Sequence, residues 1–341
     1  MPRTFDVAVA GARGLVGAEI LKLLLQRKFP AGKVHALGSA EAVGEFIEFG
    51  DDELQVQDLA DFDFSSVQIA LFALDADSAS LYVPRAAEAG CVVIDSSLFF
   101  RDETDVPLVI PAVNAQVMDG YPRRRILASP GASVVQLLLA LKPIYDAAGI
   151  VRVSVATYQP VSGNGQLAID ELVRQSIQAL NGQGVDDFRI YPRPIAFNAL
   201  PQSDAFSADG DTLEEKALSS ETRKILGDGS ISISATAVRV PVFHGSSQAL
   251  HIETCDKITA RQACVLLRQA PGVRLMDGDH GNAYPTAVTD AAQEDAVFVG
   301  RVREDASNPL GLKLWTVADD IRTTTALNGV QIAEILIRDH L

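Results

Sequence analysis

The sequence predicts a two-domain α/β protein, in which a parallel sheet flanked by helices is followed by a mixed α+β domain. Its length of 341 residues is enough for two domains of roughly 150 residues each. Up to residue 131, short apolar runs alternate with segments whose apolar residues follow a helical period. From Val151 onward, apolar and polar residues alternate over long segments, which is typical of strands with one buried face.

The first domain is expected to begin with a strand, a glycine turn and a helix. Phe5–Ala10 is apolar, Gly11 ends the run, and a helical period follows over residues 15–25. Further strands are predicted at residues 33–38, 68–73, 90–95 and 125–129, with a helix at residues 79–89. Strands and helices that alternate in this order form a parallel sheet with right-handed crossovers.

The second domain is predicted to combine helices with long strands. A helix begins near Ser133 and runs toward Tyr145, and another covers residues 166–180. Strands are expected at residues 151–158, 230–242 and 248–254. Residues 192–210 are polar and lack a period, which predicts a surface excursion. By its pattern alone, a final helix over residues 325–340 can pack on either domain.

Composition excludes several classes of protein. With 29 Lys and Arg against 44 Asp and Glu, the formal charge is -15, so neither nucleic acid nor a membrane surface is an expected partner. The longest apolar stretch, residues 134–141, is less than half a bilayer crossing, and no signal peptide is visible. The 3 cysteines are widely spaced, and the histidines lack metal-ligand spacing. We therefore expect a cytoplasmic protein without a metal site.

Three glycines mark a candidate nucleotide site. Gly11, Gly14 and Gly17 follow a strand and open a helix, where backbone amides and the helix dipole favour a diphosphate. The same glycines also suit tight packing of a strand against a helix without a nucleotide. The predicted cofactor contacts in this turn are Gly11, Ala12, Arg13, Gly14, Leu15, Val16 and Gly17. Glu41, beyond the second strand, is placed at the adenosine ribose, where a carboxylate favours NAD over NADP.

Six motifs occur in the order found in one enzyme family. They are G-A-R-G-L-V-G at 11–17, V-I-D-S-S at 93–97 with Arg101, D-V-P-L-V-I-P at 105–111 with Asn114, Y-Q-P-V-S-G at 158–163, R-V-P-V at 239–242 and A-L-N-G-V-Q-I-A at 326–333. Over its whole length the chain resembles aspartate-semialdehyde dehydrogenase, and most of all the Usg-type proteins, relatives that lack the catalytic cysteine.

This resemblance implies a Rossmann-like NAD(P)-binding domain joined to a catalytic-type domain that forms a homodimer. The family's activity is the reduction of aspartyl 4-phosphate with NADPH, a step of amino-acid biosynthesis. The resemblance also implies that the final helix returns to the first domain. The expected domains are therefore residues 1–131 plus 325–341, and residues 132–324.

The catalytic positions implied by the resemblance are altered. Where the family has a nucleophilic cysteine at a helix N-terminus this chain has Ala132, and where the family has a proton-transferring histidine it has Ser246. A methyl group cannot attack an acyl carbon, and a serine does not titrate near pH 7. Gly131 replaces the family's asparagine and Ala217 its phosphate-binding lysine. The turn at residues 73–76 is bulkier and more acidic than the family's.

Other site residues of the family are retained. The resemblance implies that Arg239 binds the substrate carboxylate, that Arg101 binds phosphate and that Gln159 lies beside the thioester. It also implies cofactor contacts at Ser162 and Gly163. Because arginine binds carboxylates through two parallel charge-assisted hydrogen bonds, this set suits a small carboxylate ligand.

Three functions are compatible with the sequence: a non-catalytic paralogue that binds a nucleotide or small carboxylate, an active NAD(P)-dependent dehydrogenase with a substitute nucleophile, and a nucleotide-binding regulator. We favour the first, because loss of both nucleophile and base leaves only binding and positioning. Ser133 is expected to cap its helix and not to act as a nucleophile, and His244 is expected to be a surface or structural histidine.

Overall fold

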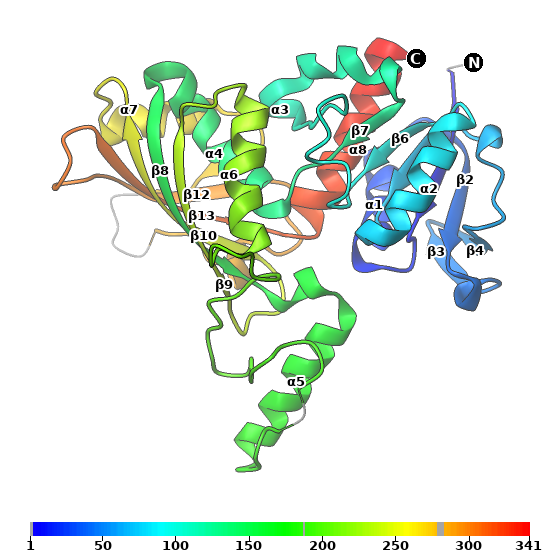
Figure 1. Cartoon of the computed structure of the whole chain (residues 1–341), viewed down its shortest axis with the longest axis horizontal. Helices are drawn as coiled ribbons and strands as arrows, with labels where there is room; N and C mark the ends of the chain where they lie inside the picture. Colours follow the sequence, from blue (N-terminus) through cyan, green and yellow to red (C-terminus); the bar gives the residue numbers. More distant parts are fainter. Residues whose placement is uncertain (1–2, 187, 278–282) are drawn as a thin grey trace. The chain divides into compact units, whose positions relative to one another are not determined.

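The computed structural model describes residues 3–186, 188–277 and 283–341. The chain divides into two units, Met1–Gly131 with Thr325–Leu341, and Ala132–Thr324 (Figure 1). The chain leaves the first unit at Gly131 and returns to it with its C-terminal segment.

The first unit is built on a seven-stranded sheet with strand order β3-β4-β2-β1-β5-β6-β7. The strands are β1 (Phe5–Ala10), β2 (Ala31–Gly38), β3 (Phe46–Phe49), β4 (Asp52–Asp58), β5 (Ile69–Phe72), β6 (Val92–Asp95) and β7 (Ile126–Ala128). All pairs are parallel except β3 with β4, which form an antiparallel edge. The predicted parallel sheet is confirmed. The strand order reverses at β1, and ligands of such sheets bind at this reversal.

Helices α1 and α8 pack together in the core of the first unit. Its helices are α1 (Leu15–Gln26), α2 (Ala76–Glu88), α3 (Pro111–Asn114) and α8 (Leu327–Ile335). Leu24 of α1, Val330 of α8 and Leu71 of β5 belong to one buried cluster. Asn328 of α8 also donates a hydrogen bond of 2.8 Å to the hydroxyl of Ser129. These contacts hold the C-terminal helix on the first unit.

The second unit contains a six-stranded sheet with strand order β11-β12-β13-β10-β8-β9. The strands are β8 (Ile150–Gln159), β9 (Ser232–Arg239), β10 (Ser246–Thr254), β11 (Val273–Leu275), β12 (Val297–Glu304) and β13 (Gly311–Ala318). β8 and β9 pair in parallel, whereas β10 is antiparallel to both of its neighbours. The predicted mixed sheet is confirmed.

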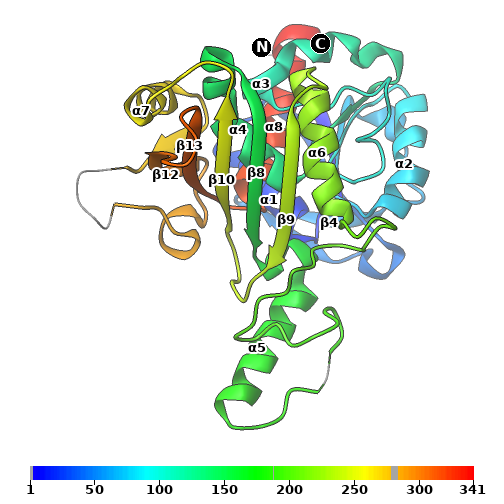
Figure 2. The same ribbon diagram turned by 60° about the vertical axis from the view of Figure 1, so that its left-hand side comes forward.

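Helices cover one face of this second sheet. The helices of this unit are α4 (Ala132–Ala148), α5 (Gln166–Leu180), α6 (Leu213–Leu226) and α7 (Ala260–Gln269), and all but α5 pack against the sheet. The long, largely buried α4 packs on β8, β10, β12 and β13, and α6 and α7 pack beside it. Burial alternates along β8, and Figure 2 shows the opposite face of β8, β9 and β10 without a covering helix among the described residues. Helix α5 extends away from the sheet in both views (Figure 1 and Figure 2).

The structure differs from the predicted elements in several places. The hairpin β3–β4, the helices α3 and α6 and the strands β11, β12 and β13 were not predicted by the sequence pattern. The final helix is not continuous α-helix, because wider helical turns at Arg322–Ala326 and Leu336–His340 flank α8. The predicted excursion at residues 192–210 is confirmed, since its described residues form only isolated bridges, Leu200 with Arg239 and Phe206 with Thr212.

Candidate functional site

The glycine turn joins β1 to α1 at the carboxyl end of the first sheet. Gly11 has φ +78°, and a Cβ there would lie 2.3 Å from the carbonyl oxygen of Ala73. A Cβ on Gly17 would lie 2.1 Å from the carbonyl oxygen of Gly11. Backbone packing therefore requires both glycines. Gly14 precedes α1 without a capping side chain, which leaves the first helical amides available to a phosphate.

Carboxylates lie around this glycine turn. The amide of Gly11 donates to the carbonyl oxygen of Leu37 at 3.0 Å, which holds the turn against the end of β2. Glu41 lies three residues after the end of β2, exposed in the short helical turn Ala40–Ala42. Glu45 forms an ion pair of 2.9 Å with Arg13 of the glycine turn. This ion pair compensates the charge of Glu45, whereas Glu41 is the residue that the sequence places at the adenosine ribose.

The acidic segment at residues 73–76 ends in a helix cap. Asp75 precedes α2 and accepts hydrogen bonds of 2.9 Å from the amide and the hydroxyl of Ser78. These bonds hold the pKa of Asp75 below its usual value. Its carboxylate occupies a helix N-terminus, a position that otherwise attracts anions.

Arg101 lies in a buried polar cluster that follows β6. It donates a hydrogen bond of 2.8 Å to the carbonyl oxygen of Ser96. Asp95, the last residue of β6, accepts a hydrogen bond of 2.6 Å from the hydroxyl of Ser97. Burial raises the pKa of Asp95, and the positive charge of Arg101 partly opposes that rise.

The position predicted for the lost nucleophile lies at the start of α4. Ala132 is the first residue of this helix. Ser133 is the second residue of α4, so the prediction that it caps the helix is wrong. Its buried hydroxyl accepts a hydrogen bond of 2.9 Å from the side-chain amide of Gln159. The nearest hydroxyl therefore has an amide, and not a general base, as its partner.

The structure brings Ser246 close to this helix start. Ser246 is the first residue of β10, it is 4% exposed, and its Oγ has no hydrogen-bond partner among the described residues. Its carbonyl oxygen accepts a hydrogen bond of 3.3 Å from Gln136, which lies one turn after Ala132. His244 precedes β10 and is exposed, as predicted.

Arg239 is a buried cation at the end of β9. Its side chain is 6% exposed, and its Nη1 and Nη2 donate to the carbonyl oxygen of Pro160 at 2.6 Å and to the hydroxyl of Ser203 at 2.8 Å. Its Nε has no partner, and no ion pair of Arg239 occurs within the described ranges. Burial lowers the pKa of Arg239, while nearby Tyr191 and Glu214 oppose that effect.

Gln159 connects the groups of this site. It ends β8 in register with Arg239 on the parallel strand β9. Its Nε2 donates to Ser133 Oγ at 2.9 Å and to Glu214 Oε1 at 2.8 Å, and its Oε1 accepts from Ser203. The sequence interpretation missed Glu214 and Ser203. A helix signal at Thr212, the N-cap of α6, was available for Glu214.

The two predicted cofactor contacts of the second unit lie beside Arg239. Ser162 is buried, and its hydroxyl donates to Asp320 at 2.7 Å. A Cβ on Gly163 would lie 3.2 Å from Nη1 of Arg239, so glycine leaves space for the guanidinium. The amide of Gly245 also donates to Asp320, at 3.0 Å. Asp320 thereby joins the loop after β8 to the turn before β10.

The two units match models of one protein family. The model described as semialdehyde dehydrogenase, NAD binding domain, matches residues 6–121, and the one described as semialdehyde dehydrogenase, dimerisation domain, matches residues 141–323. An aspartate-semialdehyde dehydrogenase of Legionella pneumophila is 49% identical over 341 residues, which cover 100% of this chain and 98% of that protein. The chain belongs to the aspartate-semialdehyde dehydrogenase family.

Solved structures of aspartate-semialdehyde dehydrogenases share this fold. The crystal structure of aspartate semialdehyde dehydrogenase II from Vibrio cholerae has a TM-score of 0.97 and 44% identity, with 99% of this chain and 100% of that chain covered. The same enzyme complexed with ASA has an equal TM-score of 0.97. The Rossmann-like NAD-binding domain and the dimerisation domain that the sequence predicts are confirmed.

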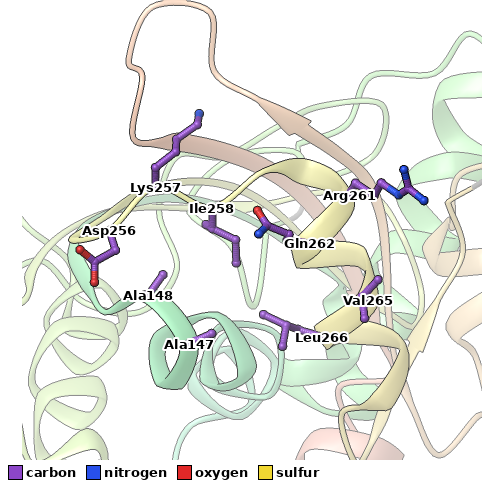
Figure 3. A pocket seen from close by; sticks show the side chains of 9 residues that line it. All are labelled: Ala147, Ala148, Asp256, Lys257, Ile258, Arg261, Gln262, Val265 and Leu266. Atoms are coloured by element: carbon purple, nitrogen blue, oxygen red, sulfur yellow. The ribbon is translucent and has the colours of Figure 1, made fainter.

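A hollow of about 420 Å³ lies apart from these aspartate-semialdehyde dehydrogenase family motifs. It is between the C-terminal end of α4 and α7, with Ala148, Ile258 and Leu266 in its apolar lining (Figure 3). Ala132 is at the other end of α4. None of the predicted site residues lines this hollow.

The described residues contain neither a membrane-spanning helix nor a metal-binding cluster. No helix there is long and apolar enough to cross a membrane. No group of three or more His, Cys, Asp or Glu side chains in the described ranges is arranged to hold a metal ion. His280 lies outside the described residues.

Proposed function

We propose that this chain is a non-catalytic member of the aspartate-semialdehyde dehydrogenase family, of the Usg type, that binds a small carboxylate at Arg239. The observation that carries the proposal is Ala132 at the start of α4, where the family's nucleophile belongs. A thiol there would be activated by the helix N-terminus, but a methyl group has no chemistry to activate. Loss of one member of a nucleophile–base unit costs about four to six decades in turnover.

Ser133, Ser246 and Cys91 do not supply a substitute nucleophile or base. Ser133 holds its hydroxyl against an amide, and Ser246 cannot take up a proton near pH 7. Cys91 is fully buried in the first unit, and burial raises its pKa to about 12. A thiol with that pKa stays protonated and unreactive.

The ligand class follows from the buried charge of Arg239. A buried guanidinium without a carboxylate partner is costly, and its unpartnered Nε leaves one edge for a bidentate carboxylate. Gln159 connects this region to Glu214: its Oε1 accepts from Ser203, and its Nε2 donates to Glu214. Glu214 therefore offers a carboxylate to a cationic group of a ligand. The site therefore favours a small molecule with both a carboxylate and an ammonium group, such as an amino acid.

The proposal also includes a preference between the two nicotinamide cofactors and an oligomeric state. NAD is favoured over NADP, because the exposed carboxylate of Glu41 is expected at the adenosine ribose, where it repels a 2′-phosphate. We further propose a homodimer, since residues 141–323 match a dimerisation domain and one face of β8, β9 and β10 carries no helix among the described residues.

Two measurements test this function. Purified protein is expected not to reduce NAD or NADP with aspartate semialdehyde and phosphate, with the Vibrio cholerae enzyme as positive control. L-Aspartate is expected to raise the melting temperature of wild type, because a ligand of the native state stabilises it by mass action. This shift is expected to disappear in Arg239→Gln. Phosphate-dependent reduction of NADP by the wild type would overturn the non-catalytic assignment.

A further inference from the structure

One side chain from the surface excursion enters the arginine site. Ser203 is 3% exposed, although Pro201, Asp204 and Ala205 around it are exposed. Its hydroxyl accepts a hydrogen bond of 2.8 Å from Nη2 of Arg239 and donates to Oε1 of Gln159. A single hydroxyl thus lies between the cation and the amide of the candidate site.

The loop that carries Ser203 is short and fixed at both ends. Before it, Leu200 and Arg239 exchange backbone hydrogen bonds of 2.9 and 2.8 Å. After it, the amide of Leu213 donates to the carbonyl oxygen of Ala205 at 2.9 Å. Between these anchors only Ser203 is buried, so the loop can withdraw its hydroxyl without opening an apolar core.

The backbone next to Ser203 has an unfavourable conformation. Asp204 has φ +77°, in the left-handed region that non-glycine residues rarely adopt. Its carboxylate accepts a hydrogen bond of 2.7 Å from the amide of Ala205, a local contact that supports this turn. Such conformations persist where surrounding contacts enforce them, and here the enforcing contacts include those of the Ser203 hydroxyl.

The Ser203 hydroxyl satisfies a hydrogen bond of Arg239 but not its charge. The hydrogen bond from Arg239 to Ser203 is already charge-assisted, but a carboxylate also neutralises the guanidinium and can accept two parallel hydrogen bonds, so it is a better partner than a serine. A ligand carboxylate that takes Nη2 and the unpartnered Nε of Arg239 must displace Ser203 from Nη2.

We propose that Ser203 is a latch: in the empty protein its hydroxyl occupies the carboxylate position at Arg239, and a ligand binds by replacing it. The proposal rests on the proposed function, because it needs Arg239 as the carboxylate site. It deepens that function by adding a competing internal group that lowers the affinity for ligand. The affinity is then set by the excursion as well as by the residues that touch the ligand.

Ser203→Ala separates the latch from a simple ligand contact. Without the hydroxyl, Arg239 loses a partner in the empty protein only, so the empty variant is expected to melt at a lower temperature than wild type. Binding of L-aspartate, measured by calorimetry, is expected to tighten about tenfold. Ser207→Ala is the matched control, since the hydroxyl of Ser207 in the same excursion bonds to the carbonyl oxygen of Asp211 instead.

The outcomes distinguish the latch from the proposed function. If Arg239→Gln loses aspartate binding but Ser203→Ala binds aspartate no more tightly than wild type, the latch is overturned. The proposed carboxylate site at Arg239 is then retained. Absence of aspartate binding in wild type and Ser203→Ala alike would overturn both. Equal tightening in Ser207→Ala and Ser203→Ala would assign the effect to loosening of the excursion and overturn the latch.

Discussion

Gln136 donates a hydrogen bond of 3.3 Å to the carbonyl oxygen of Ser246, which joins the first part of α4 to the start of β10. Gln248, further along β10, donates in turn to the carbonyl oxygen of Ser133 at 2.8 Å. These two bonds fix the start of α4 against the strand that carries Ser246. Ala132 and Ser246 are thereby held in one region of the second unit.

The first prediction uses this geometry to test the placement of Ala132. Ala132→Cys puts a thiol at the N-terminus of α4, where the helix dipole favours the thiolate. We expect this thiol to react with iodoacetamide about tenfold faster than any native cysteine. Mass spectrometry of the alkylated peptides measures the rates. Cys255 is the relevant native reference, because it is exposed whereas Cys91 is buried.

A second variant on the same helix provides the control. Ala147→Cys makes the same substitution at the exposed C-terminal end of α4, where the dipole has the opposite sign. Its thiol is expected to react more slowly than the one at position 132. Equal rates at the two ends of α4 would mean that Ala132 does not occupy an activating position.

The elements with clear periodicity were predictable from the sequence, and those without it were not. Helix α5 has the residues that were predicted, because its apolar positions follow a helical period. Helix α6 was missed because most of its residues are polar, and its limits are set by the capping box of Thr212 and Glu215 and by Gly227 at φ 64°. Consecutive β-branched threonines accompany the wider helical turn Arg322–Ala326, which a simple period does not reveal.

The sequence predicted those residues of the candidate site whose side-chain type itself indicates a role, such as an arginine for binding a carboxylate. Arg239 and Gln159 were found through motifs, but their pairing depends on the register of β8 and β9, which the sequence does not contain. Ser203 was missed because its hydrogen-bond partners are far away in sequence. In addition, its own loop has the polar composition that predicts an exposed segment. Contacts of this kind follow from tertiary packing and not from local pattern.

The second prediction concerns the choice of nucleotide. If Glu41 lies at the adenosine ribose, Glu41→Arg replaces a repulsive charge with one that binds a 2′-phosphate. We expect the ratio of NADP to NAD affinity, measured by calorimetry, to rise at least about tenfold in this variant. Glu48→Arg, the same charge change on the exposed strand β3, is the control and is expected to leave the ratio unchanged. Tighter binding of NADP than NAD by wild type would refute the placement of Glu41.

The third prediction is a pH dependence of stability from Asp320. Burial raises the pKa of this carboxyl above its usual 3.8, so the folded state binds the proton more readily than the unfolded state. Stability is therefore lost as pH rises from 3.8 through the folded-state pKa. Asp320→Asn removes this cost and keeps an acceptor for Gly245. Its urea midpoint is expected to exceed that of wild type at pH 7, with a difference that shrinks toward pH 4.

Asp305 provides a control of opposite sign. Hydrogen bonds from Ser307 and the charge of Lys313 lower its pKa to about 2, so its stabilising effect is present above the usual pKa and is lost as pH falls through the lowered one. Asp305→Asn is expected to lower stability at pH 7 and to have little effect near pH 2. A loss of stability in Asp320→Asn at pH 7 would show that the hydrogen bonds to its carboxylate outweigh the cost of burial.

The last prediction concerns the face of β8, β9 and β10 that no helix covers among the described residues. Ala249 of β10 lies in register with Ala156 of β8 and Trp315 of β13, so small and aromatic side chains form one row across this face. If two copies pair there, Ala249→Arg buries an unpaired charge between them. That costs roughly 3 kcal/mol or more and raises the dimer dissociation constant at least about a hundredfold. Light scattering at a series of concentrations is expected to show a monomer for this variant and a dimer for wild type. Ala147→Arg adds the same charge at an exposed position near the end of α4 and is expected to remain dimeric, whereas dimeric Ala249→Arg would place the interface elsewhere.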